Sequence, residues 1–192
     1  MLDPNKRNFD DSCLKETKIS SESIFGGCII SVFRDTVALP NGNTATREVV
    51  RHKGATCIVP ITDNDEILMV RQYRYALGEV TLEIPAGKLD PDETPENCAL
   101  RELAEETGMT ANKVVGLGKI YTSVGFCDEV IHMYAAVGLK PYELSPDEDE
   151  FLTLVKVPVT DLRQMILDGE ITDAKTVAAV LKVIALRDAG QL

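Results

Sequence analysis

Apolar residues recur along the chain in short runs, and turn residues separate these runs. Segments rich in β-branched and apolar side chains predict strands at residues 24–38, 45–51, 54–62, 66–73, 80–84, 114–121, 129–137 and 152–157. Turn residues at 40–43 and 63–65 separate neighbouring runs, as hairpins require. Strands therefore make up most of the predicted elements.

Helical spacing of apolar residues appears in three places. One helix is expected to follow Thr94, and two more are expected at residues 161–168 and 174–188, capped by Thr160 and Asp173. On the last helix the apolar stripe consists of Val177, Val180, Leu181 and Ile184. Helices with one apolar face, combined with many strands, predict an α/β fold in which a mixed sheet lies between helices, an α/β/α sandwich.

The length and patterning favour one folded domain with a flexible start. Residues 1–20 are mostly polar and unpatterned, so they are expected to form a flexible N-terminal segment. The remainder, residues 21–192, is expected to form a single domain, because 44% hydrophobic residues in a chain of 192 can build one core.

Charge and cysteine content exclude several classes of function. A net charge of −11 argues against a nonspecific surface for nucleic acid or for an anionic membrane. No run approaches the roughly 18 apolar residues of a membrane helix, and the N-terminus lacks a signal peptide's apolar region. The five cysteines are odd in number and show no CxxC spacing. We therefore expect a cytoplasmic protein whose partners are neither nucleic acid nor membrane.

Carboxylates are concentrated in the segment GKLDPDETPENCALRELAEETGM, which starts at Gly87. On a helix, Glu102, Glu105 and Glu106 point into one narrow sector, where like charges destabilise the helix unless cations neutralise them. Mg²⁺ prefers carboxylate and phosphate oxygens, so this face predicts a metal site. Arg101 lies four residues before Glu105 and can orient that carboxylate. A solvated acidic face is the alternative for the glutamates alone.

Two segments before this helix carry further candidate ligands. EIPAGK ends a predicted strand, and the carbonyl of Ala86 can supply an oxygen ligand, unless the segment is an ordinary strand end. RQYRYA places Arg71 and Tyr73 on one face of a strand and Gln72 and Arg74 on the other. Arginines at a strand end suit phosphate recognition, with a plain charged strand exit as the alternative.

Two loops after the helix are also candidates. TSVGFCDE, residues 122–129, contains a small glycine-bearing turn that can approach a ribose or a phosphate, or form a plain loop. SPDEDEF, residues 145–151, is either a solvated loop or a source of a general base and of an extra metal ligand.

Together these segments resemble the ADP-ribose pyrophosphatase subfamily of the Nudix hydrolases, from about residue 20 to residue 188. The acidic segment matches the Nudix signature G-x5-E-x7-R-E-U-x-E-E-x-G-U, with U a bulky aliphatic residue, at every position. PNG followed by TREVVRH, RQYR, EIPAGK, S-x-G-x-x-D-E, DEDEF and DAKT occur in the subfamily's order. The resemblance implies a Nudix-type α/β/α fold, Mg²⁺ or Mn²⁺ dependence with two or three ions, and hydrolysis of ADP-ribose to AMP and ribose 5-phosphate. It also implies a homodimer that exchanges strands at about residues 24–50.

The resemblance also implies roles for individual residues. The metal ligands would be the Ala86 carbonyl, Glu102, Glu105, Glu106 and Glu150, and the catalytic residues Glu148 as general base, with Glu105 and Arg101. Arg47, reaching across the dimer, and Arg74 match arginines that contact the substrate. The segments RQYRYA and TSVGFCDE add Arg71, Ser123, Gly125 and Glu129 as further candidate substrate contacts. One position departs from the subfamily's pattern: Val124 replaces the usual proline, which is associated with ADP-ribose preference.

Two other functions stay open. A nucleoside-diphosphate-sugar hydrolase, acting for example on GDP-mannose, shares the motif and the dimer. A Nudix-like ligand sensor without catalysis is a member of another class, but it usually has a broken glutamate set or a fused DNA-binding domain, and this chain has neither. The nucleobase also stays open, with Phe25, Tyr73, Tyr75 and Phe126 as candidate stacking partners.

Overall fold

A computed structural model describes residues 11–142 and 151–192 of the chain. Its internal contacts separate two compact units. Of the described residues, the first unit contains those up to His52 together with Ser123–Asp128, and the second contains the rest. The expectation of a single domain over residues 21–192 stays a prediction. Glu148 and Glu150, the candidate base and extra ligand, lie outside the described residues.

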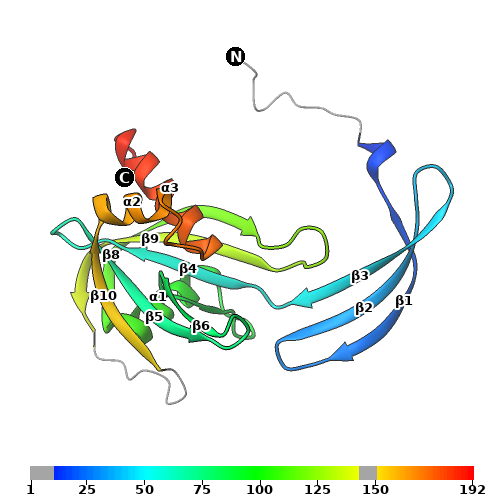
Figure 1. Cartoon of the computed structure of the whole chain (residues 1–192), viewed down its shortest axis with the longest axis horizontal. Coiled ribbons are helices and arrows are strands. Elements are labelled where there is room, and N and C mark those ends of the chain that lie inside the picture. Colours follow the sequence, from blue (N-terminus) through cyan, green and yellow to red (C-terminus); the bar gives the residue numbers. More distant parts are fainter. Residues whose placement is uncertain (1–10, 143–150) are drawn as a thin grey trace. The chain divides into compact units, whose positions relative to one another are not determined.

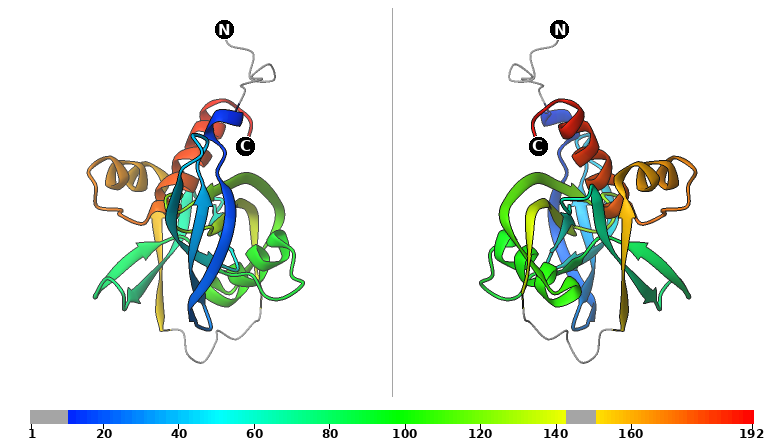
Figure 2. Two further views of the ribbon diagram at one scale, coloured as in Figure 1. Left: turned by 90° about the vertical axis from the view of Figure 1, so that its right-hand side faces the viewer. Right: turned by 90° about the vertical axis from the view of Figure 1, so that its left-hand side faces the viewer.

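The first unit is a three-stranded antiparallel sheet in the order β1-β2-β3, whose long strands run side by side (Figures 1 and 2). A short 3-10 helix, η1 (Ser12–Leu14), precedes β1 (Thr17–Gly26), β2 (Ile30–Ala38) and β3 (Thr44–His52). The turn between β2 and β3 forms as predicted, with Gly42 in the left-handed region at φ 85°.

The start of this sheet differs from the prediction. β1 begins at Thr17, inside the segment expected to be flexible, and the single strand expected at 24–38 is two strands. Every residue of β1 is exposed, and the strand pairs through its backbone with β2. Because neither face of β1 is buried, its sequence need not alternate between apolar and polar residues, and the pattern did not predict its start.

The second unit contains two sheets. The strands β4 (Ala55–Pro60), β7 (Ala86–Lys88), β8 (Met109–Tyr121) and β9 (Val130–Pro141) form a mixed sheet in the order β7-β4-β9-β8, in which β4 and β9 are parallel. The strands β5 (Glu66–Arg74), β6 (Glu79–Glu83) and β10 (Leu152–Pro158) form an antiparallel sheet in the order β10-β5-β6. The turn at residues 63–65 joins β4 to β5 without a hairpin ladder, because a single bridge, Ile61 to Ile67, links the two strands.

Helices cover both faces of the mixed sheet. The helices are α1 (Pro95–Thr107), α2 (Val159–Leu167) and α3 (Ala174–Asp188). On β4, Ile58 packs against Leu103 of α1, whereas Cys57 and Val59 belong to the larger core that contains Val180 of α3. α1 and α3 therefore lie on opposite sides of β4 and β9 (Figure 1), which confirms the predicted α/β fold with a mixed sheet between helices.

The helix ends follow the sequence signals at α1 and α3. Thr94 accepts a hydrogen bond from the Asn97 amide at 3.3 Å, and Gly108 ends α1 with φ 65°. Asp173 caps α3 in the same way. α2 differs, because it begins at Val159 and Thr160 does not cap it. The stripe expected on α3 is also partly wrong, since Leu181 is 37% exposed.

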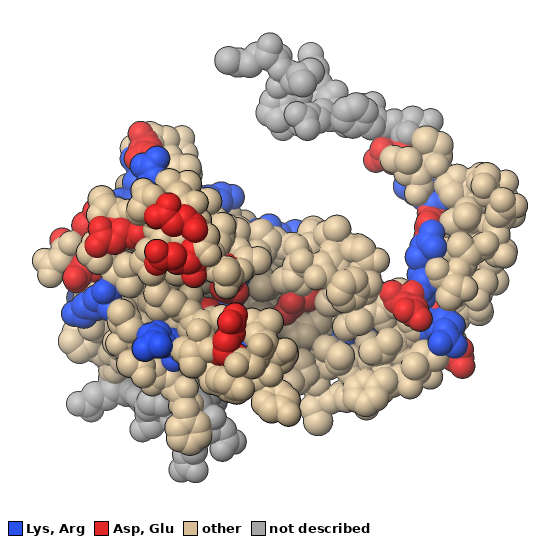
Figure 3. Space-filling view, in the orientation of Figure 1, with Lys and Arg blue, Asp and Glu red and all other residues tan. Residues whose placement is uncertain are grey.

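The surface carries the acidic excess of the composition. Acidic side chains are conspicuous over the part of the second unit formed by α2 and α3 (Figure 3), in keeping with the net charge of −11. Within the described ranges, no helix is both long enough and apolar enough to cross a membrane.

Candidate active site

The short strand β7 lies against the acidic face of α1. The side chains of Glu102 and Glu106 are buried, with whole-residue exposures of 6% and 5%. A Cβ added to Gly87 would lie 1.7 Å from Oε1 of Glu102, so this carboxylate fills the space that a side chain at residue 87 would need. The Ala86 amide donates a hydrogen bond to Oε2 of Glu106 at 3.3 Å. The segment EIPAGK and the glutamates of α1 therefore lie side by side, and their joint role in metal binding stays a prediction.

Arg101 links the acidic residues of this site. Its Nη1 donates to Oε1 of Glu102 at 2.7 Å and to Oε2 of Glu105 at 2.8 Å. Its Nε and Nη2 donate to the two oxygens of Glu93, each at 3.0 Å, and Nη2 also donates to the Lys88 carbonyl at 3.2 Å. One guanidinium thus fixes two helical carboxylates relative to the loop that precedes α1.

The charges in this network stabilise one another. The hydrogen bond that Arg101 donates to Glu93 raises the pKa of Arg101, and the opposing effect of burial does not cancel it. The same hydrogen bond from Arg101 lowers the pKa of Glu93. Both partners therefore stay charged at every pH at which the protein is expected to work.

The donor types at this site fit a hard divalent cation. Glu102 and Glu105 converge on a single nitrogen of Arg101, and the Ala86 carbonyl belongs to the strand against which Glu106 lies. Oε1 of Glu105 makes no hydrogen bond to any described residue. Carboxylate and carbonyl oxygens are the ligands that Mg²⁺ and Mn²⁺ take in proteins. No group of three or more His, Cys, Asp or Glu side chains in residues 11–142 and 151–192 is arranged around one metal position.

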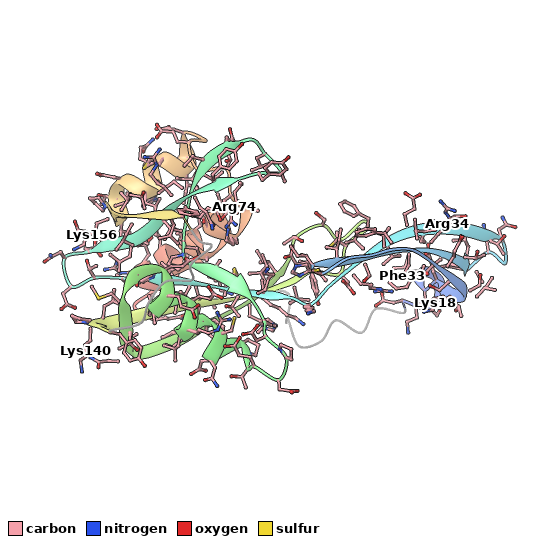
Figure 4. All side chains as sticks on the ribbon, turned by 90° about the horizontal axis from the view of Figure 1, so that it is seen from below. Lys18, Phe33, Arg34, Arg74, Lys140 and Lys156 are labelled. Atoms are coloured by element: carbon pink, nitrogen blue, oxygen red, sulfur yellow. The ribbon has the colours of Figure 1, made fainter. Side chains whose placement is uncertain are left out.

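A second charged cluster lies where β5, β6 and α3 meet, and Figure 4 shows Arg74 there. Arg74 donates through Nε and Nη2 to the two oxygens of Glu83, at 2.7 and 2.6 Å. Glu83 also accepts a hydrogen bond from Lys175, which donates in addition to Asp173 at 3.0 Å. The cluster borders a cavity of about 350 Å³, lined by Arg74, Ala76, Leu77, Thr81, Glu83, Thr172, Asp173, Ala174 and Lys175.

Sequence reasoning missed Glu83 and Lys175 as members of a site. Glu83 lies at the end of a predicted strand and Lys175 in the first turn of a predicted helix. A charged residue among apolar neighbours at such a position is the sequence signal that could have marked each as a site residue. Arg71, in contrast, is exposed on the other face of β5, so the structure does not bring it to Arg74. Glu129 accepts a hydrogen bond from Thr122 at 2.8 Å, and both residues belong to the second unit.

The remaining candidate contacts belong to the first unit. Arg47 on β3 pairs with Glu16 through Nε at 2.9 Å and through Nη2. Ser123 and Gly125 lie in a tight turn in which the Ser123 carbonyl accepts from the Cys127 amide at 2.9 Å. Hydrogen bonds between Val50 and this turn attach it to β3. Val124, at the position of the subfamily's proline, is 82% exposed.

Comparisons with known proteins agree with this architecture. A model of the NUDIX domain matches residues 51–180, and a model of the nucleoside diphosphate sugar hydrolase N-terminal domain matches residues 16–50. These two matches meet close to the boundary between the two structural units at His52. The signature residues of α1 therefore lie within the match to the NUDIX domain, and the N-terminal sheet lies almost wholly within the match to the N-terminal domain of nucleoside diphosphate sugar hydrolases.

Relatives match nearly the whole chain. The chain is 42% identical over 180 residues to the ADP-ribose pyrophosphatase of Bacillus subtilis (strain 168), covering 93% of this chain and 97% of that protein. It is 45% identical over 168 residues to the methanol dehydrogenase activator of Bacillus methanolicus, covering 86% of this chain and 91% of that protein.

A solved structure shares the fold. The crystal structure of an ADP compounds hydrolase superposes with a TM-score of 0.82 at 27% sequence identity, covering 93% of this chain and 97% of that one. The glutamates gathered on α1, the mixed sheet between helices and the domain match over residues 51–180 lead to one conclusion: the chain belongs to the Nudix family and is a Nudix hydrolase.

Proposed function

We propose that the protein hydrolyses the diphosphate of ADP-ribose, giving AMP and ribose 5-phosphate, and that Mg²⁺ or Mn²⁺ is required. The observation that supports this most is the convergence of β7 and Arg101 on Glu102, Glu105 and Glu106. The likeness to an ADP-ribose pyrophosphatase over 93% of the chain supports the choice of substrate.

The metal would be held by Glu102, Glu105, Glu106 and the Ala86 carbonyl, with Glu150 as a further ligand. Two or three such ions bound there would supply Lewis-acid chemistry, which makes an attacking water more acidic and neutralises charge on a leaving phosphate. Arg101 keeps two of these carboxylates in place, since one nitrogen donates to both Glu102 and Glu105. Gly87 leaves room for Glu102 beside the strand. Glu148 is proposed to take the proton from water.

Arginines are proposed to bind the anionic substrate. Arg74 contacts Glu83 with one edge of its guanidinium, and a guanidinium has a second edge suited to phosphate oxygens. Arg47 is proposed to contact the substrate bound by a second copy of the chain. Its pairing with Glu16 occupies it within the first unit, so substrate would have to compete with that carboxylate.

A homodimer that exchanges the N-terminal strands is part of the proposal. β1 is exposed along its length and carries Ile19, Ile24 and Phe25 at 57%, 47% and 54% exposure. Exposed apolar side chains on a three-stranded sheet favour a covering surface, which a second copy would supply. Size-exclusion chromatography with light scattering tests this, and a monomer at micromolar concentration would contradict it. A cytoplasmic location stays a prediction.

Hydrolysis of other nucleoside diphosphate sugars, such as GDP-mannose, is the second candidate. The match of residues 16–50 to the nucleoside diphosphate sugar hydrolase N-terminal domain favours it, as does Val124 in place of proline. A ligand sensor without catalysis is disfavoured, because the signature glutamates are all present.

Variants at the carboxylates test the proposal. Glu106→Gln should lower kcat by at least about a hundredfold, because it removes a ligand charge at the metal site. Glu148→Gln should also lower kcat, because it removes the proposed general base. Glu96→Gln, at an exposed position in the first turn of α1, is the matched control and should leave kcat unchanged. Activity near that of the wild type in both test variants would contradict the scheme.

A further inference from the structure

The cluster around Glu83 lies outside the acidic face of α1 and has no place in the metal scheme. We propose that Glu83 and Lys175 form a buried ion pair that positions Arg74 to bind the diphosphate of the substrate. This inference rests on the proposed function, because it takes the substrate to be a nucleoside diphosphate. Neither Glu83 nor Lys175 would touch substrate, so each is a positioning residue.

The geometry at Arg74 supports such a role. Both Nε and Nη2 donate to Glu83, whose residue exposure is 2%, so a buried carboxylate fixes one edge of the guanidinium. Among the described residues, nothing accepts a hydrogen bond from Nη1 of Arg74. The side chain of Arg74 is 38% exposed and borders the 350 Å³ cavity, so its remaining edge is accessible to an anion.

Lys175 is placed by the first turn of α3. Its side chain is 10% exposed and donates to Glu83 and to Asp173. Asp173 also caps α3 by accepting from the Thr176 amide at 3.0 Å. The Thr176 hydroxyl accepts at 3.0 Å from the amide of Ile84, the residue after Glu83. The start of α3 and the end of β6 are thus fixed to each other on both sides of the ion pair.

Lys175 limits how Glu83 can move beside Arg74. The Glu83 carboxylate accepts hydrogen bonds from both cations, and Asp173 in turn accepts one from Lys175, so the two cations and two carboxylates balance in charge. Arg74 therefore offers a substrate a guanidinium edge that is held in a fixed position. Lys175 also prevents Glu83 from rotating away from Arg74, because it occupies the oxygen Oε2.

The cluster around Glu83 is also connected through the chain to the acidic face of α1. β6 ends at Glu83, and the chain continues directly to Ala86, whose amide contacts Glu106. The pKa of Arg74 is raised, first by its hydrogen bond to Glu83 and, to a smaller extent, by the charge of Glu106. The chain segment from Glu83 to Ala86 therefore links the Arg74 cluster to the residue whose amide contacts Glu106.

Replacement of Lys175 separates this role from general stability. Lys175→Met should raise KM for ADP-ribose about tenfold, the loss expected when one charge-assisted contact weakens, while kcat stays within about threefold. Lys175→Arg should restore most of the affinity, because it keeps a cation beside Glu83. Lys182→Met, at an exposed lysine on the same helix, is the control and should change neither constant.

Binding without turnover gives a second readout. The Kd of the α,β-methylene analogue of ADP-ribose, measured by calorimetry with Mg²⁺, should rise by the same factor in Lys175→Met. If that variant does not fold, Glu83→Gln supplies the same test, because its side chain keeps the shape and loses the charge. An unchanged KM and Kd, or a fall in kcat at constant KM, would overturn the positioning role.

These outcomes are distinct from a failure of the proposed function. A wild-type protein that hydrolyses neither ADP-ribose nor any other nucleoside diphosphate compound would remove the proposed function itself. An active wild type with an unaffected Lys175→Met variant would remove only the role of the ion pair.

Discussion

The carboxylate of Glu102 occupies the place where a side chain at Gly87 would begin. The distance from an added Cβ at residue 87 to Oε1 of Glu102 is 1.7 Å, and the distance to its carboxyl carbon is 2.0 Å. Nonbonded heavy atoms cannot approach so closely, so one of the two groups must move if residue 87 gains a methyl group. The mobile group is the carboxylate, because it is the end of a flexible side chain.

Gly87→Ala should therefore damage the site more than the fold. We expect kcat to fall by about a hundredfold because Glu102 leaves its position at the proposed metal site, with a loss of stability of about 1 kcal/mol. Gly116→Ala is the matched control, because an added Cβ there meets nothing within 4 Å. Steady-state kinetics and urea unfolding measure the two effects. A Gly87→Ala enzyme with unchanged kcat would show that Glu102 is not needed where the structure places it.

Arg101→Lys should weaken the same site by another route. A lysine ammonium cannot reproduce the fork with which Arg101 contacts Glu93, Glu102 and Glu105 together. The expected result is a fall in kcat of about tenfold to a hundredfold and a weaker apparent affinity for Mg²⁺ in activity titrations. Arg163→Lys, at an exposed arginine on α2, controls for the loss of a guanidinium. Equal kinetics in the two variants would argue against an orienting role for Arg101.

Glu83 should make stability depend on pH in the acid range. Burial alone would raise the pKa of Glu83, but the hydrogen bond from Arg74 and the charge of Lys175 lower it to about 2, from an ordinary value of 4.5. A shift of this size corresponds to about 3 kcal/mol of folding free energy, present in full above pH 4.5 and lost as the pH falls toward 2.

Urea unfolding of the wild type and of Glu83→Gln checks this dependence. At neutral pH the wild type should be the more stable of the two. As the pH is lowered from 4.5 toward about 3, the difference in unfolding free energy should shrink, because protonation of Glu83 in the unfolded state becomes favourable. A difference that stays constant across this range would mean that the carboxylate charge does not stabilise the fold.

The elements that bind the proposed metal follow from local sequence, and the cluster around Arg74 does not. Thr94 and Gly108 mark the ends of α1 by capping chemistry that acts over a few residues, so the acidic face was predictable. The contact between Glu83 and Lys175 joins residues separated by 92 positions, and no local pattern in either segment predicts that the two pair. β1 was missed at its start because an entirely exposed strand has no burial pattern to detect.

Val124→Pro should shift substrate preference toward ADP-ribose. Val124 lies in the turn after Ser123, is 82% exposed and occupies the position at which the ADP-ribose pyrophosphatase subfamily usually has proline. A proline there would stiffen the turn, so the ratio of kcat/KM for ADP-ribose to that for GDP-mannose should rise by about threefold to tenfold. Val124→Ala, which adds no ring, should leave the ratio unchanged. A ratio equal in the proline and alanine variants would remove this turn from the determinants of specificity.

Product analysis with a set of substrates tests the central claim most directly. The purified protein is incubated with ADP-ribose, GDP-mannose, ADP-glucose and NADH, with Mg²⁺ or with EDTA, and the products are identified by chromatography. We predict that ADP-ribose has the highest kcat/KM, that it yields AMP and ribose 5-phosphate in equal amounts, and that EDTA abolishes the reaction. Preferred hydrolysis of another of the four compounds, or turnover of ADP-ribose that persists in EDTA, would contradict the account.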